Sequence, residues 1–319
     1  MENITGDTGM TITVASYLMG IPPGNKNPEK PQIIVNFIEG VWASGDKGQI
    51  VCDYTPVDSD VAVVQGFVHP GSKKGEHLTL RKNVFEKQQR DNKRSIIVDS
   101  NLFLYADPGN SKKFLRYSYD GIFPSTGEYC NDTPDPARWQ NISQQLGIKL
   151  KPWRKLNENI LICCQRDGGW SMDGKALMPW LVSTIQRIRK HSDRTIIVRF
   201  HPGDKNILNH KRQLARYRLK NVGVSHAQNI LQDFQSCYCV INYNSSPTVA
   251  AAIEGLPTIV LDPKNSQAAE VSHHSLSDIE NLKEFDREKW IYKMAQMHWS
   301  LGELKDGTAW RHLRKWAIK

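Results

Sequence analysis

The stretch NILICCQRDGGWS, residues 159–171, decides how this chain is expected to fold. Residues 160–164 are an uninterrupted apolar run, and a polar segment containing Gly168 and Gly169 follows at once. Short apolar runs bounded by turn residues are typical of strands in a parallel sheet that is covered on both faces. A helix-like segment follows at residues 176–191, so the sequence predicts a strand, a turn and a crossover helix.

The same alternation runs through the chain in two blocks. In the first block, strands are expected at residues 11–18, 32–38, 61–68 and 95–98, and a helix at 77–92. In the second block, further strands are expected at 195–200, 222–225, 239–242 and 258–261, and further helices at 209–219, 247–254, 285–297 and 308–316. The turn-rich segment NDTPDPAR, residues 131–138, lies between the blocks. We therefore expect an α/β fold of two domains, residues 1–145 and 146–319, each built on a parallel sheet.

The composition is that of a globular protein. Hydrophobic residues make up 39% of the 319 residues and charged residues 24%, which excludes wholesale disorder. No apolar run approaches the ~20 residues that a membrane span needs, and the polar start MENITGDTGM does not resemble a secretory signal. The six cysteines form no CxxC pair and are expected to be buried free thiols of a reducing compartment, so we expect a cytoplasmic location.

The charge is distributed unevenly between the two blocks. Residues 1–150 contain 16 Lys and Arg against 17 Asp and Glu, whereas residues 151–319 contain 26 against 16, a net charge of +10. A basic half favours a polyanionic or phosphate-bearing ligand, although a solvated basic face without a ligand would have the same composition.

The segment after the first strand of the second block contains the first candidate binding residues, Gln165, Arg166, Gly168, Gly169 and Ser171. A glycine pair at a strand-to-helix turn lets backbone amides approach a ligand, and Arg166 adds a positive charge. An ordinary tight turn would also explain the two glycines.

The next strand ends in a second candidate group, Arg199, His201 and Pro202. Arg199 and His201 alternate with Phe200, so both are expected on one side of the strand end. Arginine and histidine donors suit a phosphate oxygen. A lone histidine can instead be purely structural.

A third group, Asn244, Ser245 and Ser246, precedes Pro247 at the start of the small-residue helix. The two serines can cap this helix, and a capped N-terminus facing a cleft is also an anion site. At the other end of the helix, Glu254 is expected either to accept a hydrogen bond from a sugar hydroxyl or to be a solvated charge.

Three phosphate-compatible loops at successive strand ends predict a binding site for a nucleoside diphosphate, because the carboxyl ends of parallel strands form the ligand-binding edge of such sheets. No cluster of His, Cys, Asp or Glu has metal-ligand spacing, since His273 and His274 are adjacent, so no metal or other cofactor is expected.

Residues 158–316 resemble the donor domain of GT-B glycosyltransferases, in particular capsule and surface-carbohydrate transferases and related proteins of tailed phages. The matching strings are VRFHPG (198–203), NSSPTVAAAIEGLP (244–257) and HWSLGELKDGTAWRHL (298–313). The resemblance implies two Rossmann-like domains facing each other across a cleft, with C-terminal helices packing back. Residues 1–145 would bind the acceptor and residues 146–319 a nucleotide-sugar donor, such as UDP-glucose or another UDP-sugar, without a metal ion.

The resemblance also implies roles for the candidate residues. His201, Ser245 and Ser246 would hold the donor phosphates, and Arg166 and Arg199 would offset their charge. Many GT-B proteins have a glutamate five residues before the glycine of their Gly-x-Pro motif; in this chain Ala250 occupies that position and the acid is Glu254.

An inverting transferase needs a carboxylate base, which we expect in the first domain. The candidates near strand ends are Glu39, Asp99, Asp120 and Glu128. We favour Asp120, because it lies in the densest polar and aromatic string, RYSYDG at 116–121. Each of these acids could instead form a turn or cap a helix.

The acceptor is less clearly indicated. The basic second half and the phage-like similarity favour a 5-hydroxymethylated pyrimidine, such as 5-hydroxymethylcytosine, in double-stranded phage DNA. The alternative is a cytoplasmic transferase for capsular or surface glycans, whose basic face would meet an anionic membrane. A weaker alternative is a non-catalytic nucleotide- or carbohydrate-binding protein of the same fold.

Overall fold

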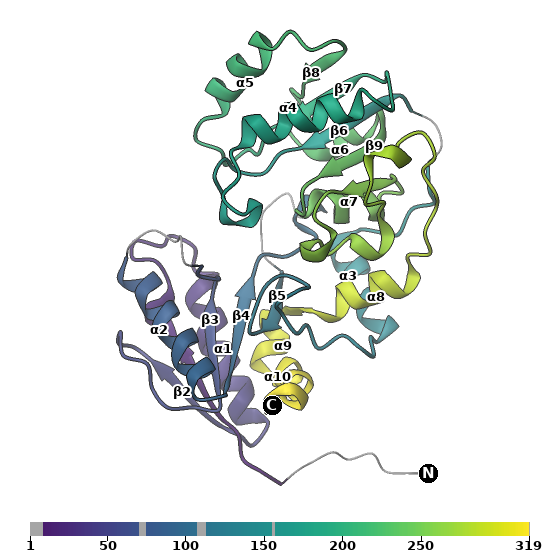
Figure 1. Cartoon of the computed structure of the whole chain (residues 1–319). Coiled ribbons are helices and arrows are strands. Elements are labelled where there is room, and N and C mark those ends of the chain that lie inside the picture. Colours follow the sequence, from purple (N-terminus) through teal and green to yellow (C-terminus); the bar gives the residue numbers. More distant parts are fainter. Residues whose placement is uncertain (1–8, 70–74, 107–112, 155–156, 319) are drawn as a thin grey trace.

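The computed structural model describes residues 9–69, 75–106, 113–154 and 157–318, and it consists of two lobes, each built around one β-sheet (Figure 1). The sheets and the helices that alternate with them confirm the α/β fold class predicted from the sequence. In the described part of the chain, no helix is both long and apolar enough to cross a membrane.

The first lobe contains a mixed six-stranded sheet in the order β11-β5-β4-β3-β1-β2. Its strands are β1 (Thr13–Tyr17), β2 (Lys47–Val51), β3 (Val61–Gln65), β4 (Arg94–Asp99), β5 (Phe114–Tyr119) and β11 (His298–Ser300). The pairs among β1, β2, β3 and β4 are parallel, whereas β5 runs antiparallel to both β4 and β11. The expected all-parallel sheet is therefore corrected at this edge, where β5 runs antiparallel to its two neighbours.

Helix α1 (Glu29–Ala43) occupies the segment where the sequence predicted a strand at 32–38. The apolar run there was misinterpreted, because its buried members lie at helical spacing: Ile33, Ile34, Phe37, Ile38 and Val41. These side chains pack against one face of the first sheet, over β1 and β3. The helix predicted at 77–92 is present as α2 (Glu76–Arg90).

The second lobe contains a fully parallel five-stranded sheet in the order β10-β9-β6-β7-β8. Its strands are β6 (Asn159–Cys163), β7 (Ile196–Arg199), β8 (Val222–Val224), β9 (Cys237–Asn242) and β10 (Thr258–Val260). The helices of this lobe are α4 (Leu177–Ile188), α5 (Ile207–Arg216), α6 (Ile230–Phe234) and α7 (Pro247–Ile253). All five strands lie at the positions predicted from the sequence.

The C-terminal segment returns to the first lobe, as Figure 1 shows in yellow. Helix α8 (Glu288–Gln296) packs on α3 (Pro136–Leu146), and β11 then joins the first sheet. Helices α9 (Leu301–Lys305) and α10 (Thr308–Leu313) pack on α1. The predicted domain boundary assigns residues 298–318 to the second domain, whereas their strand pairing and packing place them on the first.

Candidate active site

A cavity of about 480 Å³ lies between the two lobes, and we call it the interlobe cleft. Its wall on the side of the first sheet is formed by Asp99, Ser100, Asn101, Leu102, Leu104, Arg116, Ile122 and Phe123. Its wall on the side of the second sheet is formed by Gln165, Arg166, Gly169, Ser171, His201, Asn244, Ser245, Ser246, Val249, Asn265 and Gln267. Loops that follow β4, β6, β7, β9 and β10 therefore converge on one space, as expected for the carboxyl ends of parallel strands.

A hydrogen-bond network joins the loops after β6 and β9. Gln165 donates to the Ser171 hydroxyl at 2.9 Å and accepts from the backbone amide of Asn244 at 3.2 Å. The side-chain nitrogen of Asn244, Nδ2, donates to the Ser171 carbonyl and to the Asp262 carboxylate, both at 2.9 Å. Gln165 and Asn244 are buried. The network fixes the shape of this wall before any ligand binds.

Ser245 and Ser246 lie at the turn into α7. The sequence predicted Ser246 as a side-chain cap, but its hydroxyl accepts no hydrogen bond from the first turn of α7. Asn242 instead donates to the Ser245 carbonyl at 2.6 Å, and the Thr248 hydroxyl donates to the same oxygen at 3.0 Å. Asn242 and Thr248 are buried, so they hold this turn while both serines face the interlobe cleft.

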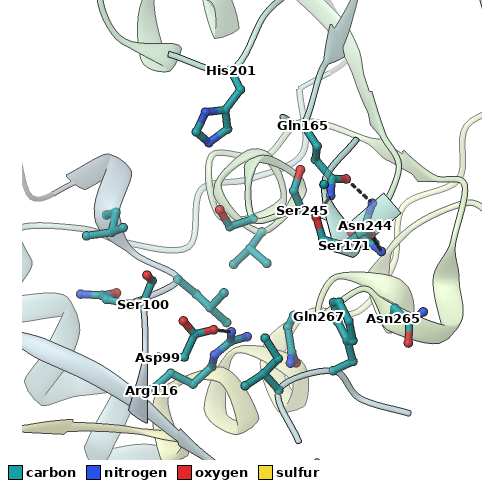
Figure 2. A pocket seen from close by; sticks show the side chains of 18 of the residues that line it. Asp99, Ser100, Arg116, Gln165, Ser171, His201, Asn244, Ser245, Asn265 and Gln267 are labelled. Carbon is teal, nitrogen blue, oxygen red and sulfur yellow. Dashed lines mark hydrogen bonds and ion pairs between the residues drawn. The ribbon is translucent and has the colours of Figure 1, made fainter. Parts of the chain in front are cut away.

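His201 extends into the cleft opposite Asp99 and Arg116 (Figure 2). The backbone amide of Gly203 donates to His201 Nδ1 at 2.9 Å, which leaves the proton of the neutral ring on Nε2. Burial, and then the charge of Arg166, lower the pKa of His201 below its usual value. His201 can therefore offer an Nε2–H donor to an oxygen atom in the cleft at neutral pH.

Arg166 packs against Gly203, where an added Cβ would lie 2.7 Å from a terminal guanidinium nitrogen. A side chain at position 203 would therefore displace the Arg166 guanidinium from its present place. The loops after β6 and β7 are also joined by the buried His210, whose Nδ1 lies 3.1 Å from the Asp204 carboxylate and whose Nε2 lies 3.6 Å from that of Asp167. Arg166 and His201 therefore come to the cleft from two loops that lie against each other.

Asp99 and Arg116 form an ion pair on the opposite wall, drawn as a dashed line in Figure 2. Asp99 is the last residue of β4, and Arg116 is its register partner on antiparallel β5. The Arg116 side chain is 9% exposed and that of Asp99 25% exposed. The carboxylate is therefore oriented by a buried cation and keeps access to the cleft.

Asp120, the residue favoured as the base, does not line the interlobe cleft. Its carboxylate accepts hydrogen bonds from Arg94 Nε and the Ser95 amide, both at 2.9 Å. The reason is the direction of β5: because β5 is antiparallel to β4, its C-terminal end lies beside the start of β4, at the opposite edge of the sheet. The same reversal brings Arg116, at the beginning of β5, to the cleft.

Arg199 and Glu254 also lie outside the cleft wall. Arg199 pairs with Asp233 at 2.6 Å and donates to the Ser225 hydroxyl at 3.3 Å. Glu254 lies at the C-terminal end of α7 and forms ion pairs with Lys151 and Arg154. Both charges are therefore paired with other residues of the second lobe.

The other candidates outside the cleft wall have local roles. Gly168 has a φ of +59°, which fits the interpretation as an ordinary tight turn, and Pro202 follows His201 without lining the cleft. Glu128 accepts from the Cys130 amide at 2.7 Å. Glu39 lies on α1, 3.7 Å from Lys305.

Several cleft residues were missed by the sequence analysis: Ser100, Asn101, Arg116, Asn265 and Gln267. Ser100 and Asn101 directly follow the strand end at Asp99, and Asn265 and Gln267 follow β10. The rule that ligands bind after strand ends would have found them if it had been applied to these two strands. Among the described residues, no group of three or more His, Cys, Asp or Glu side chains could hold a metal ion.

Comparison with known proteins establishes the class of fold. No family model matches the chain, and no curated protein sequence is similar to it. Among solved structures, two similar ones are of KpsC from Thermosulfurimonas dismutans. The beta Kdo 2,4 transferase is 13% identical with a TM-score of 0.54, over 90% of this chain and 90% of that chain. The beta Kdo 2,7 transferase is 11% identical with a TM-score of 0.51, over 93% of this chain and 98% of that chain.

At these identities the comparison shows the fold alone: two α/β lobes with facing sheets, in the arrangement of GT-B sugar transferases. The GT-B-like α/β fold predicted from the sequence is confirmed. The two KpsC structures give no support to the phage DNA part of the resemblance drawn from the sequence.

Proposed function

We propose that the chain is a glycosyltransferase that binds a nucleotide-activated sugar in the interlobe cleft and transfers the sugar to a hydroxyl of a carbohydrate acceptor. One observation carries the proposal. The cleft has phosphate-compatible donors on one wall, at His201 and Arg166, and an oriented carboxylate on the other, at Asp99. A sugar bound between these walls would have its leaving group and its attacking group on opposite sides.

The second-lobe wall would bind the nucleotide phosphate. The Arg166 guanidinium supplies charge-assisted hydrogen bonds, and the neutral His201 ring supplies one from its Nε2–H. The hydroxyls of Ser245 and Ser246 supply further donors. These groups would also stabilise the negative charge that develops on the phosphate as the bond to the sugar breaks. Arg199 and Glu254 are not part of this proposal because their charges are paired elsewhere.

Asp99 would act as the general base in place of Asp120. Its carboxylate would accept the proton of the acceptor hydroxyl while that oxygen forms the new bond to the sugar, and the nucleotide would leave with the bonding electron pair. Arg116 would position the carboxylate through their ion pair. The proton ends on Asp99 and the new glycosidic bond replaces the bond to phosphate, so the step is balanced.

A carbohydrate acceptor is favoured over DNA. The similar KpsC structures are sugar transferases named for Kdo, a sugar. The second half contains a run of basic residues on and around α4, α5 and β8, and none of this run lines the interlobe cleft: Arg187, Arg189, Lys190, Arg194, Lys211, Arg212, Arg216, Arg218 and Lys220. Two of them are used internally: Arg189 donates to four backbone carbonyls, and Arg194 pairs with Glu280 at 3.0 Å.

The test is a mass-spectrometric transfer assay. The protein would be incubated with UDP-, GDP-, dTDP- and CMP-sugars and with two acceptors: bacterial surface oligosaccharides, and duplex DNA containing 5-hydroxymethylcytosine. We expect a mass gain of one sugar on an oligosaccharide with one class of donor, lost in Asp99→Asn and retained in Asp120→Asn. A gain only on DNA would overturn the carbohydrate acceptor. Absence of both donor binding and transfer would overturn the glycosyltransferase.

A further inference from the structure

A second cavity, of about 400 Å³, opens beside the interlobe cleft at the carboxyl ends of β3 and β4. It contains Arg81 and Lys30, and we call it the Arg81 cavity. It shares Asp99, Ser100 and Asn101 with the interlobe cleft. A ligand in the Arg81 cavity would therefore contact the same carboxylate that faces the cleft.

Arg81 is the unusual feature of this cavity. It extends from α2, is 8% exposed, and its Nε donates to the Gly20 carbonyl at 2.7 Å. Its two terminal nitrogens make no hydrogen bond or ion pair within the described parts of the chain. Burial lowers the pKa of the Arg81 guanidinium to about 10, so the group remains charged at neutral pH. A buried cation without an anionic partner is costly, and proteins normally pair it.

The surrounding backbone is shaped to accommodate this side chain. Gly66 has a φ of +87°, and an added Cβ there would lie 2.6 Å from Arg81 Nη1. The Gly66 amide donates to the Val98 carbonyl at 2.8 Å, which fixes the turn after β3. A residue with a side chain at position 66 would be strained and would displace the guanidinium.

Two further polar atoms of the cavity walls have no partner among the described residues. They are the Gln65 side-chain oxygen and the Asn101 side-chain nitrogen. Asn101 is 2% exposed. A buried donor and a buried acceptor thus lie in the cavity walls near the Arg81 guanidinium, and this polar lining fits a ligand with oxyanion and hydroxyl groups.

The charge balance gives the sign of that ligand. Asp99, the carboxylate among the described lining residues, is paired with Arg116. Among the described residues that line the cavity, no carboxylate is thus left to neutralise Arg81. An anionic group would find its counter-ion there, whereas a neutral sugar would leave the guanidinium unpaired.

We infer that the Arg81 cavity binds the acceptor, and that this acceptor is a carbohydrate with a carboxylate or phosphate group close to the hydroxyl that reacts. The anionic group pairs with Arg81, and the hydroxyl reaches Asp99 at the shared wall. This inference rests on the proposed function for the reaction, but the binding it describes is independent of donor binding.

The test compares charged and neutral sugars in titration calorimetry or ligand-observed NMR. The carboxylate probe is methyl β-D-glucuronide, the phosphate probe is glucose 6-phosphate, and the neutral control is methyl β-D-glucoside. We expect at least one charged probe to bind about tenfold or more tightly than the glucoside. The preferred charged probe identifies which of the two anions the cavity selects. Equal binding of all three sugars would overturn the inference.

Three variants test whether the preference for a charged sugar over the neutral glucoside arises in the Arg81 cavity. Arg81→Gln keeps a donor for the Gly20 carbonyl and should abolish the preference for a charged probe. Gln65→Glu leaves Arg81 in place and puts a carboxylate in the same cavity, so it should also abolish the preference, even if Arg81→Gln fails to fold. Arg166→Gln, in the interlobe cleft, is the matched control and should retain it. A preference that survives Gln65→Glu, or that is lost in Arg166→Gln, would contradict the assignment.

The two proposals fail in different ways. If nucleotide sugars bind the wild-type protein but no charged probe is preferred, the acceptor assignment is wrong and the glycosyltransferase stands. If a charged probe is preferred through Arg81 but no nucleotide sugar binds, the cavity is an anion site and the proposed transferase is wrong.

Discussion

Asp99 and Arg116 face each other across two antiparallel strands, and their ion pair forms one wall of the interlobe cleft. The pair joins the end of β4 to the beginning of β5, so a change of strand direction brings together two charges that are 17 residues apart. Since Arg116 is buried, loss of the carboxylate would leave an unpaired guanidinium in the first lobe.

Asp99→Asn should lower the rate of sugar transfer by about 10²- to 10⁴-fold, the usual contribution of a general base. Asparagine retains an oxygen that accepts from Arg116 but leaves the buried guanidinium without its counter-charge, so we expect a lower melting temperature and little change in the affinity for the donor. The measurement is kcat in the transfer assay, together with the melting temperature. Asp120→Asn is the matched control: it weakens the contacts to Arg94 and Ser95 and should lower the melting temperature while kcat remains near the wild-type value.

Arg166→Gln should weaken binding of the nucleotide by about 10- to 100-fold, since it removes one charged hydrogen-bond donor from the cleft. Titration calorimetry with the nucleotide of the preferred donor measures this. Arg199→Gln is the comparison, because Arg199 is paired with Asp233 and lies outside the cleft wall. An equal loss of affinity in both variants would mean that the nucleotide does not bind at the cleft wall that contains Arg166.

Gly40→Ala tests the return of the C-terminal segment to the first lobe. Alanine normally stabilises a helix interior by about 1 kcal/mol relative to glycine. Here an added Cβ on α1 would lie 1.9 Å from the Leu304 carbonyl oxygen of α9, so we expect a destabilisation of about 2 kcal/mol or more. Urea unfolding would measure the change. A stabilised variant would show that α9 does not pack on α1 at this distance.

His298 should make the free energy of unfolding depend on pH in the acidic range. Its ring is fully buried, and burial lowers its pKa to about 3, while in the unfolded chain the pKa returns to about 6.5. The unfolded state therefore binds the extra proton between these values, so stability should fall as the pH drops below about 6.5, by up to about 1.4 kcal/mol per pH unit. His298→Gln should reduce this slope in urea unfolding between pH 4 and 6.5. An unchanged slope would exclude His298 as its source.

Most of the second lobe could be predicted from the sequence, because its strands are continuous apolar runs separated by clear turns. The loops after β6, β7 and β9 followed from the same rule, and Gln165, His201 and Ser245 do line one cleft. The rule depends only on local pattern and on all strands being parallel.

The first lobe was harder to predict because its edge breaks that rule. β5 was not recognised among the prolines of its region, and its antiparallel direction, which moves Asp120 away from the cleft and Arg116 into it, is set by tertiary pairing. The pairing of β11 with β5 joins residues about 180 positions apart in the chain. Arg81 lies on a helix with many polar residues, and only its burial in the folded lobe distinguishes it from the other charged residues of that helix.

The central claim is that the interlobe cleft holds the nucleotide-activated sugar between His201 and Asp99. The most direct measurement is a crystal structure of the wild-type protein with the nucleotide that binds most tightly in titration. The account predicts a phosphate within hydrogen-bond distance of His201 Nε2 and Arg166, with the sugar side of the nucleotide facing Asp99. A nucleotide bound elsewhere on the protein, with the interlobe cleft empty, would contradict it.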